Sequence, residues 1–324
     1  MRIFITGGTG FIGGYLVTRL LSDGHEPVVL ARSPEAVAKV RELGAEPVEG
    51  GLTVPGPWQK AVADCERVVH CAAKADDWGR RSEFWNVNVE GTRNVVEAAM
   101  GNVDQFVHVS SIAAHRGSGT RDESTPAVRG GHPYCDTKAA AEEVIDESVG
   151  RGLNAQLARV ANVYGPKDPH VLPRILDQVS KGSFVVVGDG NQPSNLIYVD
   201  DVVGALVAIL FGDVDPGERF LITDPDAPVL REAIRIAFEV LDIDPRINRM
   251  PKWAAMGAAA LSQAFGLLTG RRPFLTFYAV LSVGNVRILV NDRTRSRLSW
   301  SPQVGFEEGV ERTVAWWRQT GGDV

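Results

Sequence analysis

Tyr134 and Lys138 are the side chains of this 324-residue sequence best placed for proton transfer. They follow Pro133, which favours the first turn of a helix, and precede the helix-forming residues 139–142. Residues four apart share one face of a helix, so the phenol and the ammonium would be neighbours. A nearby positive charge favours the phenolate, which suits a proton donor and acceptor. Such pairs are also common in surface packing, so the rest of the chain decides their meaning.

A glycine-rich turn near the start of the chain predicts a dinucleotide site. The apolar segment 2–6 is typical of a strand, and Gly7, Gly10 and Gly13 separate it from a helical pattern of leucines. In such a turn, the first glycine permits the tight bend, the second admits the pyrophosphate and the third allows close helix packing. The helix N-terminus then offers unpaired N–H groups and a partial positive charge to the phosphates.

The end of the second predicted strand, 27–30, indicates which dinucleotide binds. Ala31 stands where NAD sites usually carry a carboxylate for the ribose 2′-hydroxyl. Arg32 is instead suited to a 2′-phosphate, Ser33 adds a hydroxyl, and Lys39 on the next helix could reach the same phosphate. We therefore expect NADP(H) to be preferred. NAD(H) is the alternative if Arg32 is only an exposed loop residue.

Alternating apolar segments predict an α/β fold with a Rossmann-type, doubly wound parallel sheet. Further strands are expected at 46–49, 67–70, 106–109 and 157–160, and helices at 58–63, 84–100 and 133–149. Ligands bind at the carboxyl ends of strands in such sheets, where Cys71, Ala72 and Ala73 follow one strand and Ser110 and Ser111 end another.

Two polar residues of these elements have alternative interpretations. Asn88 shares a helix face with Phe84, Gly91 and Val95, which indicates a buried amide with a specific hydrogen-bonding role, unless it is a surface asparagine. His70 ends a buried strand, and we interpret it as a packing residue rather than a catalyst.

Together, these motifs resemble those of the extended short-chain dehydrogenase/reductase superfamily. The likeness rests on residues 6–13, 71–73, 88–92, 110–112, 134–138, 162–166 and 197–201. Residues 72–79, 110–112 and 170–174 are most similar to the 3-beta-hydroxysteroid dehydrogenase branch, which includes reductases of long-chain 2-alkyl-3-oxo acids. The spacing of Arg32 and Lys39 also resembles that of dihydroflavonol reductases, in which an arginine and a lysine read the 2′-phosphate.

The resemblance implies a role for each matching residue. Ser111 would polarise the substrate oxygen, and Tyr134 would exchange a proton with it. Lys138 would hold the nicotinamide ribose and keep the tyrosine acidic, while Asn88 would brace the active-site helix or the strand-end backbone. Cofactor contacts would come from Gly7, Thr9, Gly10, Phe11, Ile12, Gly13, Arg32, Ser33, Lys39, Ala72, Ala73, Lys74, Ser110, Tyr134, Lys138, Val160, Asn162 and Val163. Family members also suggest a homodimer formed through the helices at 84–100 and 133–149.

The second half of the chain is expected to form a smaller C-terminal substrate lobe. We place an NADP-binding domain at 1–165, with core elements returning at about 184–222, and the lobe mainly at 166–324. Helices are predicted at 171–181, 202–211, 230–240, 253–269 and 306–319, and strands at 184–187, 196–199 and 220–223, with 283–290 ambiguous. The apolar residues between 253 and 278 favour a hydrophobic substrate, unless they only form the core of the lobe.

The apolar run 253–269 is shorter than the roughly 20 residues of a membrane-spanning helix. We interpret it as an amphipathic helix that covers the substrate pocket, with a membrane-surface contact as the alternative.

Composition limits the partners and the compartment. A formal net charge of -6 and a pI near 5.6 argue against nucleic acid as a partner. The three cysteines have no metal-site or disulfide spacing, which suits a reducing cytoplasm, and no metal is expected. The first residues enter a strand pattern without the features of a signal peptide, so we expect a cytoplasmic protein.

These features predict an NADP(H)-dependent oxidoreductase that interconverts a ketone and a secondary alcohol on a steroid-like, 3-oxoacyl or aromatic substrate. A sugar or nucleotide-sugar epimerase or dehydratase is the alternative. Residues 195–197 lack the arginine with which nucleotide-sugar members commonly hold a diphosphate, which weakens that alternative. A non-catalytic NADP-sensing protein is the third hypothesis, and the intact pair of Tyr134 and Lys138 argues against it.

Overall fold

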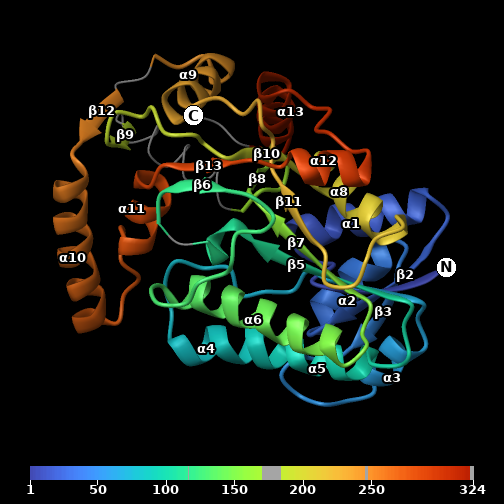
Figure 1. Cartoon of the computed structure of the whole chain (residues 1–324). Helices are drawn as coiled ribbons and strands as arrows, with labels where there is room; N and C mark the ends of the chain where they lie inside the picture. Colours follow the sequence, from blue (N-terminus) through green and yellow to red (C-terminus); the bar gives the residue numbers. More distant parts are fainter. Residues whose placement is uncertain (116, 170–183, 245–246, 322–324) are drawn as a thin grey trace.

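The central feature of the computed structural model, which describes residues 1–115, 117–169, 184–244 and 247–321, is a parallel sheet (Figure 1). Within these residues, seven strands are arranged in the order β11-β7-β5-β4-β1-β2-β3. They are β1 (Arg2–Thr6), β2 (Glu26–Ala31), β3 (Glu46–Glu49), β4 (Arg67–His70), β5 (Gln105–Ser111), β7 (Ala155–Val160) and β11 (Arg219–Ile222). Strand order reverses between β1 and β4, which opens a crevice at their carboxyl ends. The predicted fold class is confirmed.

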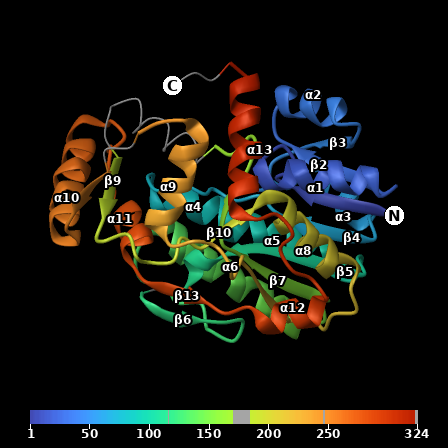
Figure 2. The ribbon, with the colours of Figure 1, turned by 90° about the horizontal axis from the view of Figure 1, so that it is seen from above.

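Helices cover both faces of the sheet (Figures 1 and 2). The helices α1 (Phe11–Ser22), α2 (Pro34–Glu42) and α8 (Val199–Phe211) pack on one face. The helices α3 (Trp58–Ala63), α5 (Gly91–Ala99) and α6 (Pro133–Gly150) pack on the other. Because the strands are covered on both sides, their residues are apolar in nearly continuous runs, as in the fully buried Ile3, Phe4 and Ile5.

The helix predicted at 84–100 contains a wider turn in its middle. The α-helix α4 (Arg81–Trp85) leads into a π-helical turn, η1 (Asn86–Glu90), which continues as α5. A π turn accommodates one extra residue and is frequently found at functional sites. Apolar spacing does not signal such an insertion, so the sequence suggested one uninterrupted helix.

The strands that follow β7 in the chain join different sheets. Among the described strands that follow β7, β11 joins the central sheet, where it extends the edge at β7 as the seventh strand. The segment β9 (Phe184–Val187) pairs with β12 (Ile247–Met250), and β10 (Leu196–Tyr198) pairs with β8 (Asn162–Tyr164). The connection to β11 includes α8, which provides the crossover that a parallel strand requires.

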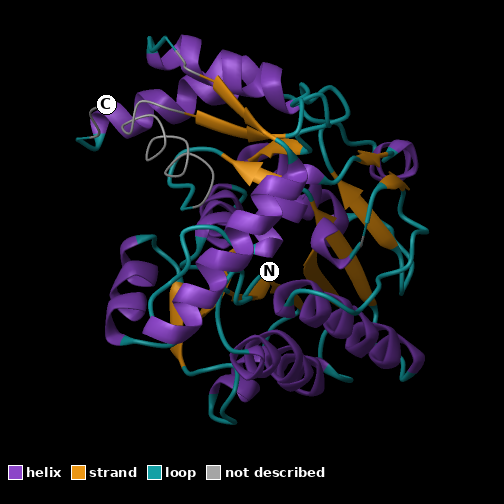
Figure 3. Cartoon of the chain, turned by 90° about the vertical axis from the view of Figure 1, so that its left-hand side faces the viewer, coloured by secondary structure: helices purple, strands orange, loops and turns teal. Residues whose placement is uncertain are grey.

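The remaining elements form a smaller lobe at the side of the molecule. It contains β9, β12, α9 (Leu230–Leu241), α10 (Lys252–Thr269) and α11 (Phe277–Gly284), with α10 outermost (Figures 1 and 2). Figure 3 views the molecule from this side, with strands lying between helices. The apolar run predicted as a pocket-covering helix forms α10, but its large side chains face outward. The helix predicted at 171–181 lies outside the described residues.

The last third of the chain also returns to the core. The ambiguous segment at 283–290 contains the end of α11 and β13 (Arg287–Leu289), which pairs with β6 (Gly119–Arg121). The helices α12 (Asp292–Leu298) and α13 (Phe306–Gln319) follow. In the described part of the chain, no helix is both long and apolar enough to cross a membrane.

Candidate active site

The turn between β1 and α1 leaves little room for side chains. Gly7 has a φ of 72°, and a Cβ at this position would lie 2.8 Å from the backbone nitrogen of Ala72. A Cβ on Gly13 would lie 2.2 Å from the carbonyl oxygen of Gly7 and would push α1 away from the turn. No side chain caps the N-terminus of α1 after Gly10, so its first amide groups are available to an anion. This cradle fits a dinucleotide pyrophosphate.

The basic residues predicted to read the cofactor lie near this turn. Lys39 Nζ donates to the carbonyl oxygen of Thr9 at 2.7 Å, which joins α2 to the glycine-rich turn. Arg32 follows β2 directly and is exposed. Ser33 caps α2 by accepting a hydrogen bond from the backbone of Ala36, so its oxygen is already used within the helix.

A chain of hydrogen bonds determines the tautomer of His70. Thr92 Oγ1 donates to the carbonyl oxygen of Asn88 at 2.7 Å, and it therefore accepts from His70 Nε2 at 2.9 Å. His70 Nδ1 then accepts from Thr6 Oγ1 at 2.6 Å, while Thr6 accepts from the backbone of Ala72. Burial lowers the pKa of His70 to about 3, so the ring is neutral, as these bonds require. Both ring nitrogens are occupied, so His70 connects β1, β4 and α5.

Asn88 connects the loop after β4 to α6. Its Oδ1 accepts from the backbone nitrogen of Lys74 at 2.7 Å, and its Nδ2 donates to the carbonyl of Lys74 and to Thr137 Oγ1. Thr137 in turn donates to the carbonyl of Pro133, just before Tyr134. The side chain of Asn88 is only 2% exposed. The π-helical turn therefore places a buried amide between two backbone segments of the site.

The three predicted catalytic side chains meet at the carboxyl end of β5. Tyr134 and Lys138 come from α6, and Ser111 ends β5, where its Oγ accepts from the backbone of Ala113 at 3.1 Å. Ser111 is close enough to the Tyr134 phenol to act on its pKa. Lys138 is buried, and its Nζ donates to the carbonyl oxygen of Val109 at 2.7 Å.

Burial is the main influence on the pKa values of Tyr134 and Lys138. It raises the pKa of the Tyr134 phenol, and the interaction with Ser111 acts against that rise. Burial also lowers the pKa of Lys138 to about 8, although Glu142 opposes the shift. The ammonium of Lys138 is directed to the Val109 carbonyl, and its effect on the acidity of the tyrosine stays a prediction.

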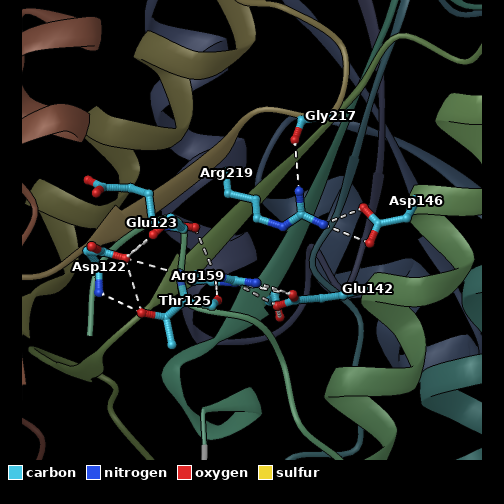
Figure 4. A network of polar contacts seen from close by, with 10 residues as sticks. Asp122, Glu123, Thr125, Glu142, Asp146, Arg159, Gly217 and Arg219 are labelled. Carbon is cyan, nitrogen blue, oxygen red and sulfur yellow. Dashed lines mark hydrogen bonds and ion pairs between the residues drawn. The ribbon is translucent and has the colours of Figure 1, made fainter. Parts of the chain in front are cut away.

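A buried ion pair supports α6 against the strands (Figure 4). Glu142 accepts from Arg159 Nη2 at 2.7 Å and from Ser110 Oγ at 2.6 Å, and both ionic side chains are at most 2% exposed. Arg159 Nη1 also donates to the backbone carbonyls of Glu123 and Thr125. The hydroxyl of Ser110, which we expected to face the cofactor, is thus committed to this network.

A hollow of about 470 Å³ lies beside this network. Its lining includes Glu142 and Arg159, together with Asp146 and Arg219, which form an ion pair at 2.6 Å (Figure 4). None of the predicted catalytic or cofactor residues lines it. Within the described residues, no group of three or more His, Cys, Asp or Glu side chains could hold a metal ion.

Two other predicted cofactor contacts have separate partners. Lys74 Nζ forms an ion pair with Glu83 at 3.1 Å. Lys74 is therefore connected to the site by its backbone, which is hydrogen-bonded to Asn88, and not by its ammonium. Asn162 donates to the carbonyl oxygen of Ser194 at 3.0 Å, across the small sheet of β8 and β10.

The sequence interpretation missed two aromatic residues next to Tyr134. His132 begins α6, where Nδ1 accepts from the backbone of Tyr134 at 3.2 Å and Nε2 donates to the carbonyl of Asp77. Its ring stacks on Tyr278 of α11 with centroids 4.5 Å apart, and the Tyr278 ring lies 6.1 Å from that of Tyr134. A histidine directly before Pro133 was a detectable signal, whereas only the fold brings α11 to this position.

Arg287 is a further residue that the sequence interpretation missed. It is 9% exposed, and its Nη atoms donate to the carbonyl oxygens of Ile112 and Ser282 at 3.3 and 3.2 Å. Its Nε has no hydrogen-bond partner among the described residues. Ile112 follows Ser111 directly, and the charge of Arg287 acts against the raised pKa of Tyr278. A buried cation with uncharged hydrogen-bond partners therefore lies beside the three predicted catalytic residues.

Comparisons with known proteins point to one family and one fold. Residues 3–222 match the NAD dependent epimerase/dehydratase family. A 4-hydroxy-2-methyl-3-oxo-4-farnesyl-3,4-dihydroquinoline-1-oxide ketoreductase of Stigmatella aurantiaca is 30% identical over 96% of this chain and 95% of its own. A 2-alkyl-3-oxoalkanoate reductase of Shewanella oneidensis is 26% identical, and the match covers 96% of this chain and 85% of the relative. The structure of UDP-glucuronic acid 4-epimerase from Bacillus cereus has a TM-score of 0.80 and 20% sequence identity to this chain. The match covers 100% of this chain and 99% of the epimerase, which shows a shared fold.

Proposed function

Because the chain belongs to the NAD dependent epimerase/dehydratase family, we propose that it is an NADP(H)-dependent oxidoreductase that interconverts a ketone and a secondary alcohol. The predicted superfamily and the prediction of an enzyme are confirmed by the family match and the reductase relatives. The observation that carries the finer proposal is the meeting of Ser111, Tyr134 and Lys138 at the same sheet edge as the glycine-rich cradle.

Each residue of the trio has one task in this proposal. A bound nicotinamide supplies or accepts the hydride. Ser111 Oγ orients the substrate oxygen, and Tyr134 Oη donates a proton to that oxygen in reduction and recovers it in oxidation. The raised pKa of Tyr134 keeps the phenol protonated at neutral pH, which favours its use as an acid. Lys138, one turn further along α6, holds the cofactor ribose.

The preference for NADP(H) is supported by charge near the cradle. Lys39 is anchored at Thr9, and Arg32 follows the neighbouring strand directly after Ala31, the position at which NAD sites usually carry a carboxylate. A 2′-phosphate between these two cations would form charge-assisted hydrogen bonds. A 2′-hydroxyl would leave both cations without an anionic partner.

The proposed substrate is a hydrophobic ketone with an anionic group, in the class of long-chain 3-oxo acids. The names of the two reductase relatives describe ketones that carry a farnesyl group or an alkyl chain. In this chain, His132 and Tyr278 supply an aromatic surface beside Tyr134. Arg287, with a free Nε, supplies a positive charge that a carboxylate near the reacting carbonyl would neutralise.

The proposed reaction is tested by following NADPH oxidation over 3-oxo acids, sterol ketones and aromatic ketones. We expect net NADPH consumption with a 3-oxo acid, and a 10²–10⁴-fold lower kcat in Tyr134→Phe, which is about the contribution of general acid catalysis. Tyr198→Phe, which removes a hydroxyl beside Arg312, is the matched control.

Two outcomes would contradict the proposal. Turnover of a nucleotide sugar without net NADPH consumption would identify the epimerase or dehydratase alternative. Equal behaviour of Tyr134→Phe and the wild type across the whole panel, with cofactor bound, would favour the non-catalytic NADP-sensing protein.

The role of Arg287 is tested by comparing a 3-oxo acid with its methyl ester. We expect Arg287→Gln to raise KM for the acid about 10- to 100-fold, the loss of one charge-assisted pair, with little change for the ester. Arg287→Lys should recover most of the affinity because it keeps the charge. An equal rise in KM for both compounds would instead assign Arg287 a structural role at the Ile112 and Ser282 carbonyls.

A further inference from the structure

The outer face of α10 is apolar along the length of the helix. Trp253, Leu261, Phe265 and Leu268 recur at helical spacing and are 79%, 76%, 57% and 87% exposed. The buried residues of the same helix are small, namely Ala255, Ala259, Ser262 and Gly266. A helix whose only role is to cover a core has the opposite arrangement, with its large apolar side chains turned inward.

The apolar surface continues past the end of α10. Leu267 and Phe274 are 76% and 86% exposed and lie on either side of Arg271 and Arg272 in the sequence. We call Trp253, Leu261, Phe265, Leu267, Leu268 and Phe274 the α10 face. The helix lies at the periphery of the molecule in two perpendicular views (Figures 1 and 2). Contiguous exposed apolar surface of this kind marks a binding surface rather than ordinary solvent exposure.

The charged residues of the segment around the α10 face are all basic. Residues 247–291 contain five basic and no acidic residues, in a chain whose formal net charge is -6. Arg249 is exposed in β12, just before α10, and Arg271 is exposed after the end of the helix. Lys252 is exposed at the first position of α10, where its Nζ donates to the carbonyl of Gly284 and to Asn285 Oδ1. Arg272 forms ion pairs with Asp76 and Asp77 of the core, and Arg287 is buried. Three exposed cations therefore flank the apolar face at both ends.

We propose that the α10 face binds an anionic lipid bilayer, with its large side chains at the boundary of the headgroups and acyl chains. Arg249, Lys252 and Arg271 would then lie at the level of the lipid phosphates. Interfacial helices combine a large apolar face with basic residues in this way, and each basic residue adds attraction to an anionic leaflet. The proposal rests on exposure and charge and does not depend on the proposed reaction.

A second copy of the chain fits this surface less well. In a twofold dimer the same surface lies on both sides of the contact, and α10 would pair with itself either antiparallel or parallel, depending on the direction of the axis. In an antiparallel pair, Arg249 and Lys252 at the start of each helix would approach Arg271 of the other copy, and in a parallel pair they would approach their own counterparts. Like charges would meet at both ends of the contact, whereas lipid phosphates would neutralise them.

The test is co-sedimentation of the full chain with vesicles of phosphatidylglycerol and phosphatidylcholine, compared with vesicles of phosphatidylcholine alone. We expect at least tenfold stronger binding to the anionic vesicles, falling as salt is added. The triple variant Leu261→Ser/Phe265→Ser/Leu268→Ser should lose at least tenfold in binding with an unchanged circular dichroism spectrum, because these side chains are exposed. Arg249→Gln/Arg271→Gln should remove most of the preference for anionic vesicles.

A control variant separates lipid binding at α10 from general surface hydrophobicity. The oligomeric state separates it from dimerisation. Val54→Ser/Val128→Ser, at positions 63% and 44% exposed elsewhere in the molecule, should leave vesicle binding unchanged. Absence of binding to anionic vesicles would overturn the proposal. So would a dimer in analytical ultracentrifugation that the triple variant converts to a monomer while vesicle binding is absent, because a second copy would then cover the α10 face.

Discussion

Arg32 is the residue on which cofactor choice depends in our proposal. It is exposed after β2, on the strand next to the glycine-rich turn, and Lys39 reaches that turn through the Thr9 carbonyl. A guanidinium binds a phosphate in a bidentate manner, and a 2′-hydroxyl gives it no equivalent anion. In this proposal the side chain would therefore distinguish two cofactors that differ only at one ribose position.

We predict that Arg32→Ala weakens NADPH binding about 10- to 100-fold and leaves NADH binding nearly unchanged, because one charged hydrogen-bonding group is lost. Isothermal titration of both cofactors measures the effect. Arg41→Ala, in the last turn of the same helix as Lys39, is the matched control. An unchanged affinity for NADPH would leave the preference without support from this residue.

The π-helical turn between α4 and α5 is the element that holds the site's backbone in place. Its buried Asn88 satisfies polar groups of Lys74 in the loop after β4 and contacts Thr137 in α6. His132, at the start of α6, adds a second link to the same loop through the carbonyl of Asp77. The contribution of Asn88 to activity would therefore be one of positioning.

We predict that Asn88→Ala lowers the free energy of unfolding by about 1–3 kcal/mol, because buried polar groups lose their partner. The same variant should lower kcat more than it raises KM, since the position of Tyr134 changes. Urea unfolding and steady-state kinetics measure both quantities. Asn88→Asp, which keeps the acceptor for the Lys74 amide, should recover part of kcat, and the exposed Asn102→Ala serves as control. Lost stability with unchanged kcat would contradict a positioning role.

Three buried histidines make the stability of the whole fold depend on pH. Burial lowers the pKa of His70 to about 3 and of His115 to about 4, and it holds that of His108 well below its usual range. All three are neutral in the folded protein near neutral pH, whereas in the unfolded chain they titrate near 6.5. Below pH 6.5 the unfolded state therefore binds protons that the folded state does not.

We predict that the free energy of unfolding falls as pH decreases from 6.5 toward about 4. Each histidine contributes a loss of about 2 kcal/mol between pH 6.5 and pH 5, at 1.36 kcal/mol per unit. Urea unfolding at pH 7.5, 6 and 5 measures this dependence. His115→Leu, which removes one titrating group, should make it shallower, and equal stability at pH 7.5 and pH 5 would contradict the prediction.

The sequence by itself determined those features whose parts are close in the chain. The glycine-rich turn and the helix carrying Tyr134 and Lys138 are local patterns, because turn and helix geometry depend on neighbouring residues. The parallel sheet followed from the alternation of apolar strands with helices. The family resemblance added the expectation that Ser111 joins the pair, and the structure has these side chains at one sheet edge.

Only the tertiary structure decided which distant segments meet and which way a face points. It brought Tyr278 to Tyr134 and Arg287 to Ile112, placed β11 at the edge of β7 and turned the Lys138 ammonium to Val109. It also turned the large side chains of α10 outward. Apolar spacing shows that a helix has an apolar face, but the packing partner that would bury that face is encoded elsewhere in the chain or in another molecule.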